Sequence, residues 1–315
     1  MIQTGTTEDC LMRSENYPGA ELAGRISSDT IIRRDEPLSK RTTLRVGGPA
    51  DLYIEPASEE DLAIVAGFCA EHKVPVFVLG RGSNVLVKDG GFRGVAICLA
   101  QPCFSRIEIA GEHLHCGAGA KLKTVAAEAS RHELTELEFL EGIPGSVGGA
   151  LRMNAGAMGG AIYDVVDSVR MMDWSGRVQE RSAGEMNTGY RSCAMLKTHI
   201  ALSAVFRGRR GKREEIERRM KEFSRKRWES QPAAPSAGCI FKNPGQVPAG
   251  KLIDELGLKG TRVGGAYVSA EHGNFLVNDG TATAQDVLEL IGTIQRRVLL
   301  ERGIKLETEV EIVGE

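Results

Sequence analysis

The chain has 315 residues, 42% of them hydrophobic and 26% charged, and its formal net charge is −2. These values are ordinary for a globular protein, and so small a charge excludes a bulk electrostatic attraction to nucleic acid or to a membrane surface. No apolar run approaches the ~20 residues that a membrane-spanning helix needs. The length exceeds one ordinary core, so we expect two or three domains, with no nucleic-acid or membrane partner.

Residues 1–25 carry acidic side chains and no apolar stretch, which predicts a loosely ordered polar tail and not a signal peptide. The cysteines are odd in number, dispersed and without a CxxC pair, which favours a reducing compartment over a disulfide scaffold. They are Cys10, Cys69, Cys98, Cys103, Cys116, Cys193 and Cys239. We therefore expect a cytoplasmic protein, and we expect it to be a monomer.

Residues 26–103 alternate strands with one helix. A short strand at 52–54 ends before Pro56. Ser58, with Asp61 three residues later, predicts a capping box at the start of a helix with one apolar face. An apolar strand at 74–79 runs into the loop 80–84, and a further strand follows at 95–99.

Residues 104–211 predict further short strands, at 106–109 and 165–172, around a helix that starts at Leu122. Residues 173–176 are typical of a hairpin turn. A highly charged helix over 211–230 then connects to the final third. There Thr283 and Asp286 predict the capping box of another helix, which Gly303 ends. The pattern is α+β, with predicted pieces at 26–103, 104–211 and 212–315.

Two glycine-rich loops interrupt this pattern. In the first, Gly80–Asn84, two glycines let the backbone approach a ligand, while Ser83 and Asn84 offer side-chain donors. Successive N–H groups in such a turn can bind anionic oxygens. A plain turn between two strands is the alternative. A Rossmann fingerprint is excluded because Val85 stands where its third glycine would be, and no P-loop motif occurs.

The second loop spans residues 141–150 (EGIPGSVGGA) and is followed by Asn154-Ala-Gly156. So many small residues cannot build a core, but they let a flat, bulky ligand lie against bare backbone. Two such loops on one chain favour a cofactor that carries phosphate.

Residues 43–50 (TLRVGGPA), the GRGSNVL loop and GIPGSVGGA with its following NAG together resemble the UDP-N-acetylenolpyruvoylglucosamine reductases. These belong to the vanillyl-alcohol-oxidase-like FAD-binding superfamily. The resemblance runs from about residue 30 to the C-terminus. No obvious tyrosine-bearing insertion follows Tyr190, which is like the second, shorter type of the family.

The resemblance implies a two-subdomain FAD-binding module over 26–103 and 104–211. It also implies an α+β substrate-binding domain over 212–315 that closes over the substrate. FAD would be held without a covalent bond, since neither loop core contains His or Cys. The cofactor-binding residues implied are Gly80, Arg81, Gly82, Ser83, Asn84, Gly142, Ile143, Pro144, Gly145, Ser146, Gly148, Gly149, Asn154 and Gly156.

The family's reaction implies NADPH as hydride donor and UDP-N-acetylenolpyruvoylglucosamine as substrate, reduced to UDP-N-acetylmuramate in peptidoglycan precursor synthesis. Hydride addition creates an enolate-like carboxylate, so catalysis needs a proton donor and groups that stabilise the charge. Tyr190-Arg191 matches the family's Tyr-Arg motif. The match implies that Arg191 binds the carboxylate in a fork. A surface salt bridge is the alternative for Arg191.

Residues 236–244 (SAGCIFKNP) match the family's proton-donor segment, with Cys239 where serine is more usual. A thiol titrates near ~8.5, far below an alcohol, so it is the easier acid. Its weaknesses are oxidation and loss of the proton to give thiolate. For any lone cysteine the alternative is a small buried hydrophobe.

Near the C-terminus, the alternating pattern of residues 306–313 places Glu307, Glu309 and Glu311 on one face of a strand. The family's C-terminal glutamate matches Glu309, which implies a catalytic role; three solvated carboxylates are the alternative. A structural histidine is the alternative for His272. No metal site is predicted, because the histidines are dispersed. The substrate-binding candidates are Tyr190, Lys242, Asn243, His272 and Asn274.

Two other functions compete with this reductase. A flavin oxidase of the same superfamily would pass electrons to oxygen, but Arg191, Cys239 and Glu309 in matching segments speak against it. A non-catalytic protein that binds FAD or a UDP-sugar has only the serine-to-cysteine departure in its favour.

Overall fold

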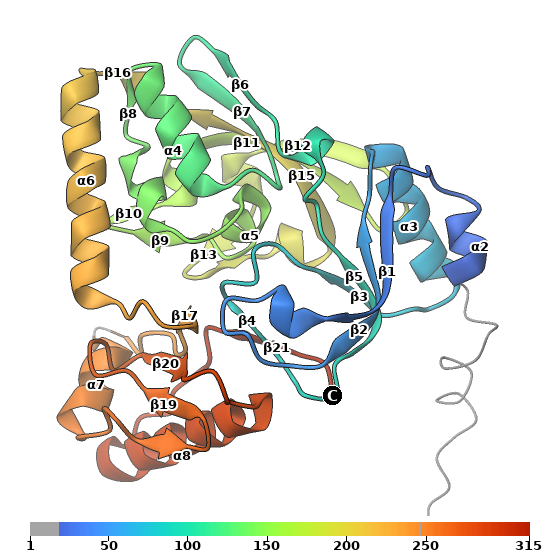
Figure 1. Cartoon of the computed structure of the whole chain (residues 1–315). Helices are drawn as coiled ribbons and strands as arrows, with labels where there is room; N and C mark the ends of the chain where they lie inside the picture. The colour runs from blue at the N-terminus through green and yellow to red at the C-terminus, as the bar shows by residue number, and fades with distance from the viewer. Residues whose placement is uncertain (1–18, 246) are drawn as a thin grey trace, which may run out of the picture.

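The computed structural model describes residues 19–245 and 247–315. Most of the predicted polar tail, together with Cys10, lies outside the described residues. Within them, three larger sheets organise three bodies (Figure 1), and the predicted α+β class is confirmed. The predicted domain boundaries remain predictions. None of the described helices combines the length and the apolar character that crossing a membrane requires.

The first body is built on a four-stranded sheet in the order β1-β2-β5-β3. Strand β1 pairs antiparallel with β2, whereas β5 is parallel to both β2 and β3, so α3 serves as the crossover that parallel strands need. Its elements are α2 (Gly19–Ala23), β1 (Ile31–Pro37), η1 (Leu38–Lys40), β2 (Pro49–Glu55), α3 (Glu59–Glu71), β3 (Val76–Val78), β4 (Val85–Val87), β5 (Phe92–Ile97) and η2 (Pro102–Phe104).

Only half of the predicted capping box forms at the start of α3. The Ser58 hydroxyl accepts the backbone N–H of Asp61 at 3.1 Å, as predicted. The Asp61 carboxylate does not return to Ser58. It instead accepts the Ser27 N–H at 2.9 Å and the Thr30 hydroxyl at 2.8 Å, and so ties the entry of β1 to the helix.

The second body is built on a five-stranded antiparallel sheet in the order β12-β11-β15-β7-β6. The predicted hairpin turn at 173–176 is confirmed, since it joins the paired strands β11 and β12. The elements are β6 (Ile107–Ala110), β7 (His113–Gly117), α4 (Leu122–Arg131), β8 (Leu134–Thr135), η3 (Glu138–Gly142), α5 (Val147–Arg152), β9 (Gly156–Ala157), β10 (Gly160–Ala161), η4 (Ile162–Asp164), β11 (Val166–Asp173), β12 (Val178–Ser182), η5 (Ala183–Glu185), β13 (Thr188–Gly189), β14 (Ser192–Cys193), η6 (Met195–Lys197), β15 (His199–Arg207) and β16 (Arg209–Arg210).

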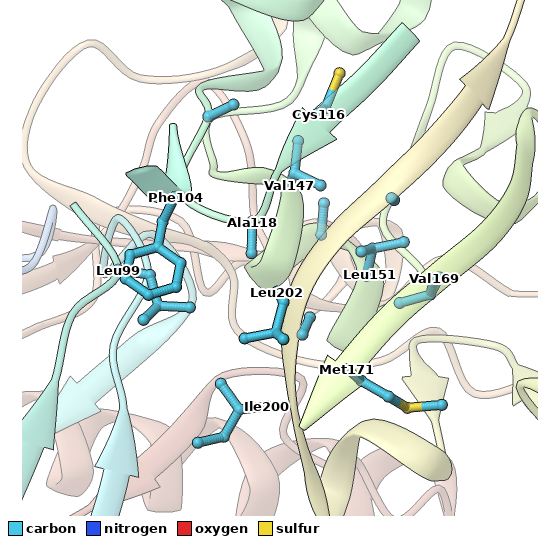
Figure 2. Packing of buried hydrophobic residues seen from close by; sticks show 14 of the residues in the cluster. Leu99, Phe104, Cys116, Ala118, Val147, Leu151, Val169, Met171, Ile200 and Leu202 are labelled. Atoms are coloured by element: carbon cyan, nitrogen blue, oxygen red, sulfur yellow. The ribbon is translucent and has the colours of Figure 1, made fainter. Parts of the chain in front are cut away.

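The first two bodies share one hydrophobic core. Leu99 and Phe104, at the end of the first body, belong to the same buried cluster as Leu202 of β15, and Figure 2 shows them side by side. Val147 and Leu151 on α5 cover this sheet from within the second body. A shared core holds the two bodies as one unit, because separating them would expose this apolar surface to water.

The charged helix predicted at 211–230 is confirmed as α6 (Arg213–Ser230). It packs along α4 and η3 of the second body (Figure 1). Ile216 is buried, while Met220 and Phe223 pack against the shared core. The helix thus carries the chain along the outside of the second body before the third body begins.

The third body has a four-stranded sheet in the order β17-β20-β19-β18. Helix α8 (Ala284–Arg302) has both predicted ends: Thr283 and Asp286 form a capping box, and Gly303 ends the helix with a φ of +66°. The hydrophobic core of the third body includes Leu44, Val46 and Leu86 from the first body, so the first and third bodies are also packed together. The elements are β17 (Ser236–Cys239), α7 (Ala249–Glu255), β18 (Arg262–Val263), β19 (Ala266–Val268), β20 (Phe275–Asn278) and α8 (Ala284–Arg302).

The chain ends by returning to the first body, where β21 (Glu311–Val313) pairs in parallel with β4. The prediction of one strand face over 306–313 is wrong, because residues 306–310 are not a strand; they are held by the isolated bridge of Phe241 with Thr308 and by a bond from the Glu309 N–H to Ile240 O at 2.7 Å. The carboxylates therefore diverge. The Glu307 side chain is 70% exposed, whereas that of Glu309 is 14% exposed.

Candidate active site

A cavity of about 1070 Å³ lies where the three bodies meet. It is lined by β3 and the loop after it, by parts of α5 and β15, and by residues 231–236 with Phe275 from the third body. Cofactor and ligand pockets usually measure about 300–1,000 Å³, so this cavity suits a large ligand.

The first glycine loop and the start of α5, which are far apart in sequence, meet at this wall. A Cβ on Gly80 would lie 2.9 Å from Oγ of Ser146. Gly82 has a φ of +62°, and a Cβ there would lie 2.4 Å from the carbonyl oxygen of Arg41. Only glycine fits this conformation, so the loop presents bare backbone beside the cavity.

The prediction of one loop over 141–150 is only partly correct. Residues 138–142 form η3, and α5 begins after Ser146, which is extended at the N-cap position. The N–H groups of Val147 and Gly148 donate to the carbonyls of Ala120 and Ala118 at 2.9 and 2.8 Å. These bonds to the turn before α4 hold the segment in place, although its glycines argue against a helix.

The predicted cofactor residues divide into two groups. Gly80, Arg81, Ser83, Pro144, Ser146, Gly148 and Gly149 line the cavity. Within the described part of the chain, the following do not line it: Gly82, Asn84, Gly142, Ile143, Gly145, Asn154 and Gly156. Asn154 and Gly156 instead contact the hairpin that carries Arg191, because the Asn154 amide donates to Gly189 O at 3.0 Å and Gly156 O accepts Arg191 Nη2 at 3.5 Å.

The structure brings the three candidate catalytic residues together from three segments. Nε of Arg191 lies 3.0 Å from Oε1 of Glu309, and both side chains are largely buried. The Nε–H of Arg191 does not point at this oxygen, so the contact is an ion pair and not a well-directed hydrogen bond. Cys239 is close enough for both charges to act on its thiol. Among the described residues, none of these three lines the cavity, but Gly238, next to Cys239, and Glu311, two residues after Glu309, do line it.

Burial dominates the electrostatics of this cluster. It raises the pKa of the Cys239 thiol to about 12, with a further rise from the Glu309 carboxylate, while Arg191 and the Asn274 side chain act in the opposite direction. Burial also raises the pKa of Glu309, against the attraction of Arg191 and Lys242. The thiol therefore stays protonated at neutral pH, which removes the expected risk of thiolate but also makes Cys239 a weaker acid than a free cysteine.

The predicted substrate residues differ in what their side chains can reach. Tyr190 is 55% exposed and lies under Arg191, with its ring centroid 5.3 Å from the guanidinium carbon. Lys242 is partly exposed and pairs with Glu307 at 3.3 Å. Both side chains remain accessible to a ligand. The Asn243 amide oxygen is already occupied, since it accepts the backbone N–H of Ala249 at the start of α7 at 3.0 Å.

His272 and Asn274 serve the fold of the third body. Nδ1 of His272 accepts the Asn274 N–H at 3.1 Å, and burial lowers the pKa of its imidazole. The buried Asn274 amide accepts the Phe241 N–H at 2.9 Å and donates to the Phe241 carbonyl at 2.8 Å. Asn274 therefore holds the segment that carries Cys239, and His272 holds the backbone of Asn274.

Other cavity residues gave no signal in the sequence. Nη2 of Arg152 donates to Oε1 of Glu311 at 2.7 Å, and its Nη1 donates to Leu196 O at the same distance. Arg227 and Trp228, at the end of α6, also line the cavity. These residues come from α5, β21 and α6, and no local pattern could have predicted that they meet.

Two family models match separate parts of the chain. An FAD binding domain model matches residues 50–182, and a model described as the C-terminal domain of UDP-N-acetylenolpyruvoylglucosamine reductase matches residues 231–313. Together with a large cavity flanked by bare glycine backbone, this defines the chain as an FAD-dependent oxidoreductase.

Full-length relatives narrow the class to one family. The chain is 43% identical over 305 residues to the UDP-N-acetylenolpyruvoylglucosamine reductase of Clostridium botulinum (strain Alaska E43 / Type E3), covering 96% of this chain and 99% of the relative. It is 44% identical over 292 residues to that of Clostridioides difficile (strain 630), covering 92% and 96%. The crystal structure of the enzyme from Thermus caldophilus matches with a TM-score of 0.78 at 40% identity, covering 90% and 99%. The chain belongs to the UDP-N-acetylenolpyruvoylglucosamine reductase family.

Proposed function

We propose that the cluster of Arg191, Glu309 and Cys239 is where this chain reduces UDP-N-acetylenolpyruvoylglucosamine to UDP-N-acetylmuramate. The observation that carries the proposal is that these three residues, from three distant segments, come together next to Gly238 and Glu311, which line the cavity. FAD, when bound, would supply the hydride chemistry that links NADPH to the enolpyruvyl group of the substrate. The residues that would hold FAD are the cavity-lining members of the two glycine segments, from Gly80 to Ser83 and from Pro144 to Gly149.

Arg191 supplies the positive charge that the reaction needs. Hydride addition places negative charge on the substrate's carboxylate and its adjoining carbon, and a guanidinium can bind such a group through two N–H donors. Glu309 holds Arg191 from one side at 3.0 Å, which limits the rotation of the guanidinium. Because the pair is largely buried, its charges are weakly screened and act strongly on a neighbouring reacting group.

Cys239 supplies the proton. Its raised pKa keeps the sulfur protonated throughout the neutral range, so the donor is always in the competent form. The S–H bond breaks as a C–H bond forms on the carbon next to the one that receives the hydride. The thiolate left behind lies near Arg191, whose charge favours it, and solvent then returns the proton.

The substrate's diphosphate and sugar are assigned to the exposed parts of Tyr190 and Lys242. The Lys242 ammonium pairs with Glu307, whose side chain is exposed, so a phosphate group can replace Glu307 as its partner. The proposal also includes a monomer in the cytoplasm that acts on small molecules and binds neither nucleic acid nor membrane. In support, all six cysteines within the described residues are free thiols, as a reducing compartment maintains them.

An anaerobic titration tests the proposal. The purified protein should be yellow, and acid precipitation should release the flavin because it is not covalently bound. NADPH should bleach the colour, and UDP-N-acetylenolpyruvoylglucosamine should restore it. Colour that does not return on adding the substrate contradicts the proposal. Rapid peroxide formation in air without any UDP-sugar would identify an oxidase instead.

A further inference from the structure

The two chain segments that carry the Arg191–Glu309 ion pair each accept a hydrogen bond from an asparagine in or just after a glycine-rich segment. Nδ2 of Asn84, in the first segment, donates to the carbonyl oxygen of Glu309 at 3.0 Å. Nδ2 of Asn154, after the second segment, donates to the carbonyl oxygen of Gly189 at 3.0 Å, two residues before Arg191. The two bonds have the same donor, the same type of acceptor and the same length, but they come from different bodies.

Asn84 holds the Glu309 segment at two points. Its side chain binds Glu309, and its own carbonyl accepts the N–H of Glu311 at 3.0 Å. Pairing of β21 with β4 begins at that residue, with Glu311 opposite Val85. Residues 306–310 are irregular; the Glu309 N–H donates to the Ile240 carbonyl at 2.7 Å, but no strand ladder fixes the Glu309 carbonyl. The Asn84 amide therefore supplies the contact that a strand partner would otherwise make.

Asn154 holds a hairpin that is too short to be stable alone. Strands β13 and β14 pair only through Thr188 with Cys193 and Gly189 with Ser192, and Tyr190-Arg191 is the turn between them. Arg191 has a φ of +54°, and Asn154 itself has a φ of +40°. Side chains rarely adopt this left-handed backbone, so the hairpin needs outside contacts to keep Arg191 in place.

One N–H of each side-chain amide is committed to the protein backbone in this arrangement. The acceptors are carbonyls of the two segments that carry Glu309 and Arg191, so the bonds act on the backbone of the ion pair. We propose that Asn84 and Asn154 are positioning residues that set the geometry of the Arg191–Glu309 pair for hydride transfer to the substrate. This rests on the function proposed above for Arg191 and Glu309.

The test measures the two half-reactions of the holoenzyme separately by anaerobic stopped flow, in Asn84→Ala, Asn154→Ala and the isosteric Asn84→Asp and Asn154→Asp. Reduction by NADPH should change little. Reoxidation by UDP-N-acetylenolpyruvoylglucosamine should slow about 10- to 100-fold, since small misplacements of a reacting group have costs of this order. The Asp variants should be no better than Ala, because a carboxylate cannot donate to a carbonyl.

Asn278→Ala is the matched control. Its Nδ2 donates to Leu44 O at 3.0 Å, it is equally an asparagine bonded to a backbone carbonyl, and it lies outside the catalytic cluster. It should lower the Tm without slowing reoxidation. If Asn278→Ala slows reoxidation as much as the other variants, or if the Asp variants behave like the wild type, the positioning role is overturned.

A double-mutant cycle separates this inference from the proposed function. If Asn154 acts through Arg191, then Asn154→Ala should slow reoxidation no further in an Arg191→Ala background, and additive losses would overturn the inference. A wild-type reoxidation rate in Arg191→Ala alone would overturn the proposed function itself. If Arg191→Ala is reoxidised slowly while the Asn84 and Asn154 variants are reoxidised at the wild-type rate, the positioning role is overturned and the proposed function stands.

Discussion

Gly82→Ala should weaken FAD binding far more than Gly111→Ala, a glycine-to-alanine change at another left-handed position. A left-handed backbone with a Cβ costs about 1–2 kcal/mol. The added Cβ would also lie 2.4 Å from Arg41 O and 2.6 Å from the Thr42 Cα, which are backbone atoms that cannot move aside alone. Overpacking of this kind costs about 1–3 kcal/mol. The sum, about 2–5 kcal/mol, corresponds to at least a roughly 30-fold rise in the Kd for FAD if the cost falls on the binding-competent loop.

Gly111→Ala provides the control for this experiment. Gly111 lies in the turn between β6 and β7, has a φ of +65°, and would have no atom within 4 Å of an added Cβ. It therefore carries the backbone cost without the steric cost. Titrating FAD into apoprotein, followed by flavin fluorescence, gives the Kd of each variant. If Gly82→Ala binds FAD as tightly as Gly111→Ala, the steric argument and the placement of FAD at this loop are both refuted.

Three further predictions concern the catalytic cluster and the contacts between bodies. Cys239→Ala should be bleached by NADPH but reoxidised by the substrate about 10²- to 10⁴-fold more slowly, while Cys239→Ser should retain turnover; full turnover of the alanine variant would end the assignment. Because a raised pKa disfavours the reactive thiolate, iodoacetamide should label Cys239 slowly at pH 8 and faster towards pH 12. Glu309→Gln should shift the curve of labelling against pH to lower pH. Peptide mapping measures the labelling, and a midpoint near pH 8.5 in the wild type would contradict this prediction. Asp89 accepts the N–H groups of Ala284 and Gln285 at 2.8 and 2.9 Å, so Asp89→Ala should cost about 1–2 kcal/mol of the free energy of unfolding, and an unchanged denaturant midpoint would count against this cap.

The sequence by itself determined the class of fold and the chemistry to look for. The capping box at Thr283, the end at Gly303 and the hairpin turn at 173–176 are local features, set by dihedral preferences and short-range hydrogen bonds. They could be predicted because neighbouring residues alone decide them. Residues 43–50, the GRGSNVL loop and GIPGSVGGA likewise indicated the family, and the segments around Arg191 and Cys239 then matched its motifs, since each motif is contiguous.

Only the tertiary structure decided how these segments work together. It placed Asn84 and Asn154 against the backbone of the catalytic segments, although both belong to the segments expected to bind FAD. It turned residues 147–152 into a helix through bonds to Ala118 and Ala120. It separated Glu309 from Glu307, because the strand begins only at Glu311. It also raised the pKa of Cys239, because burial depends on which bodies pack around the thiol. These outcomes depend on contacts between residues far apart in the chain, which no local pattern encodes.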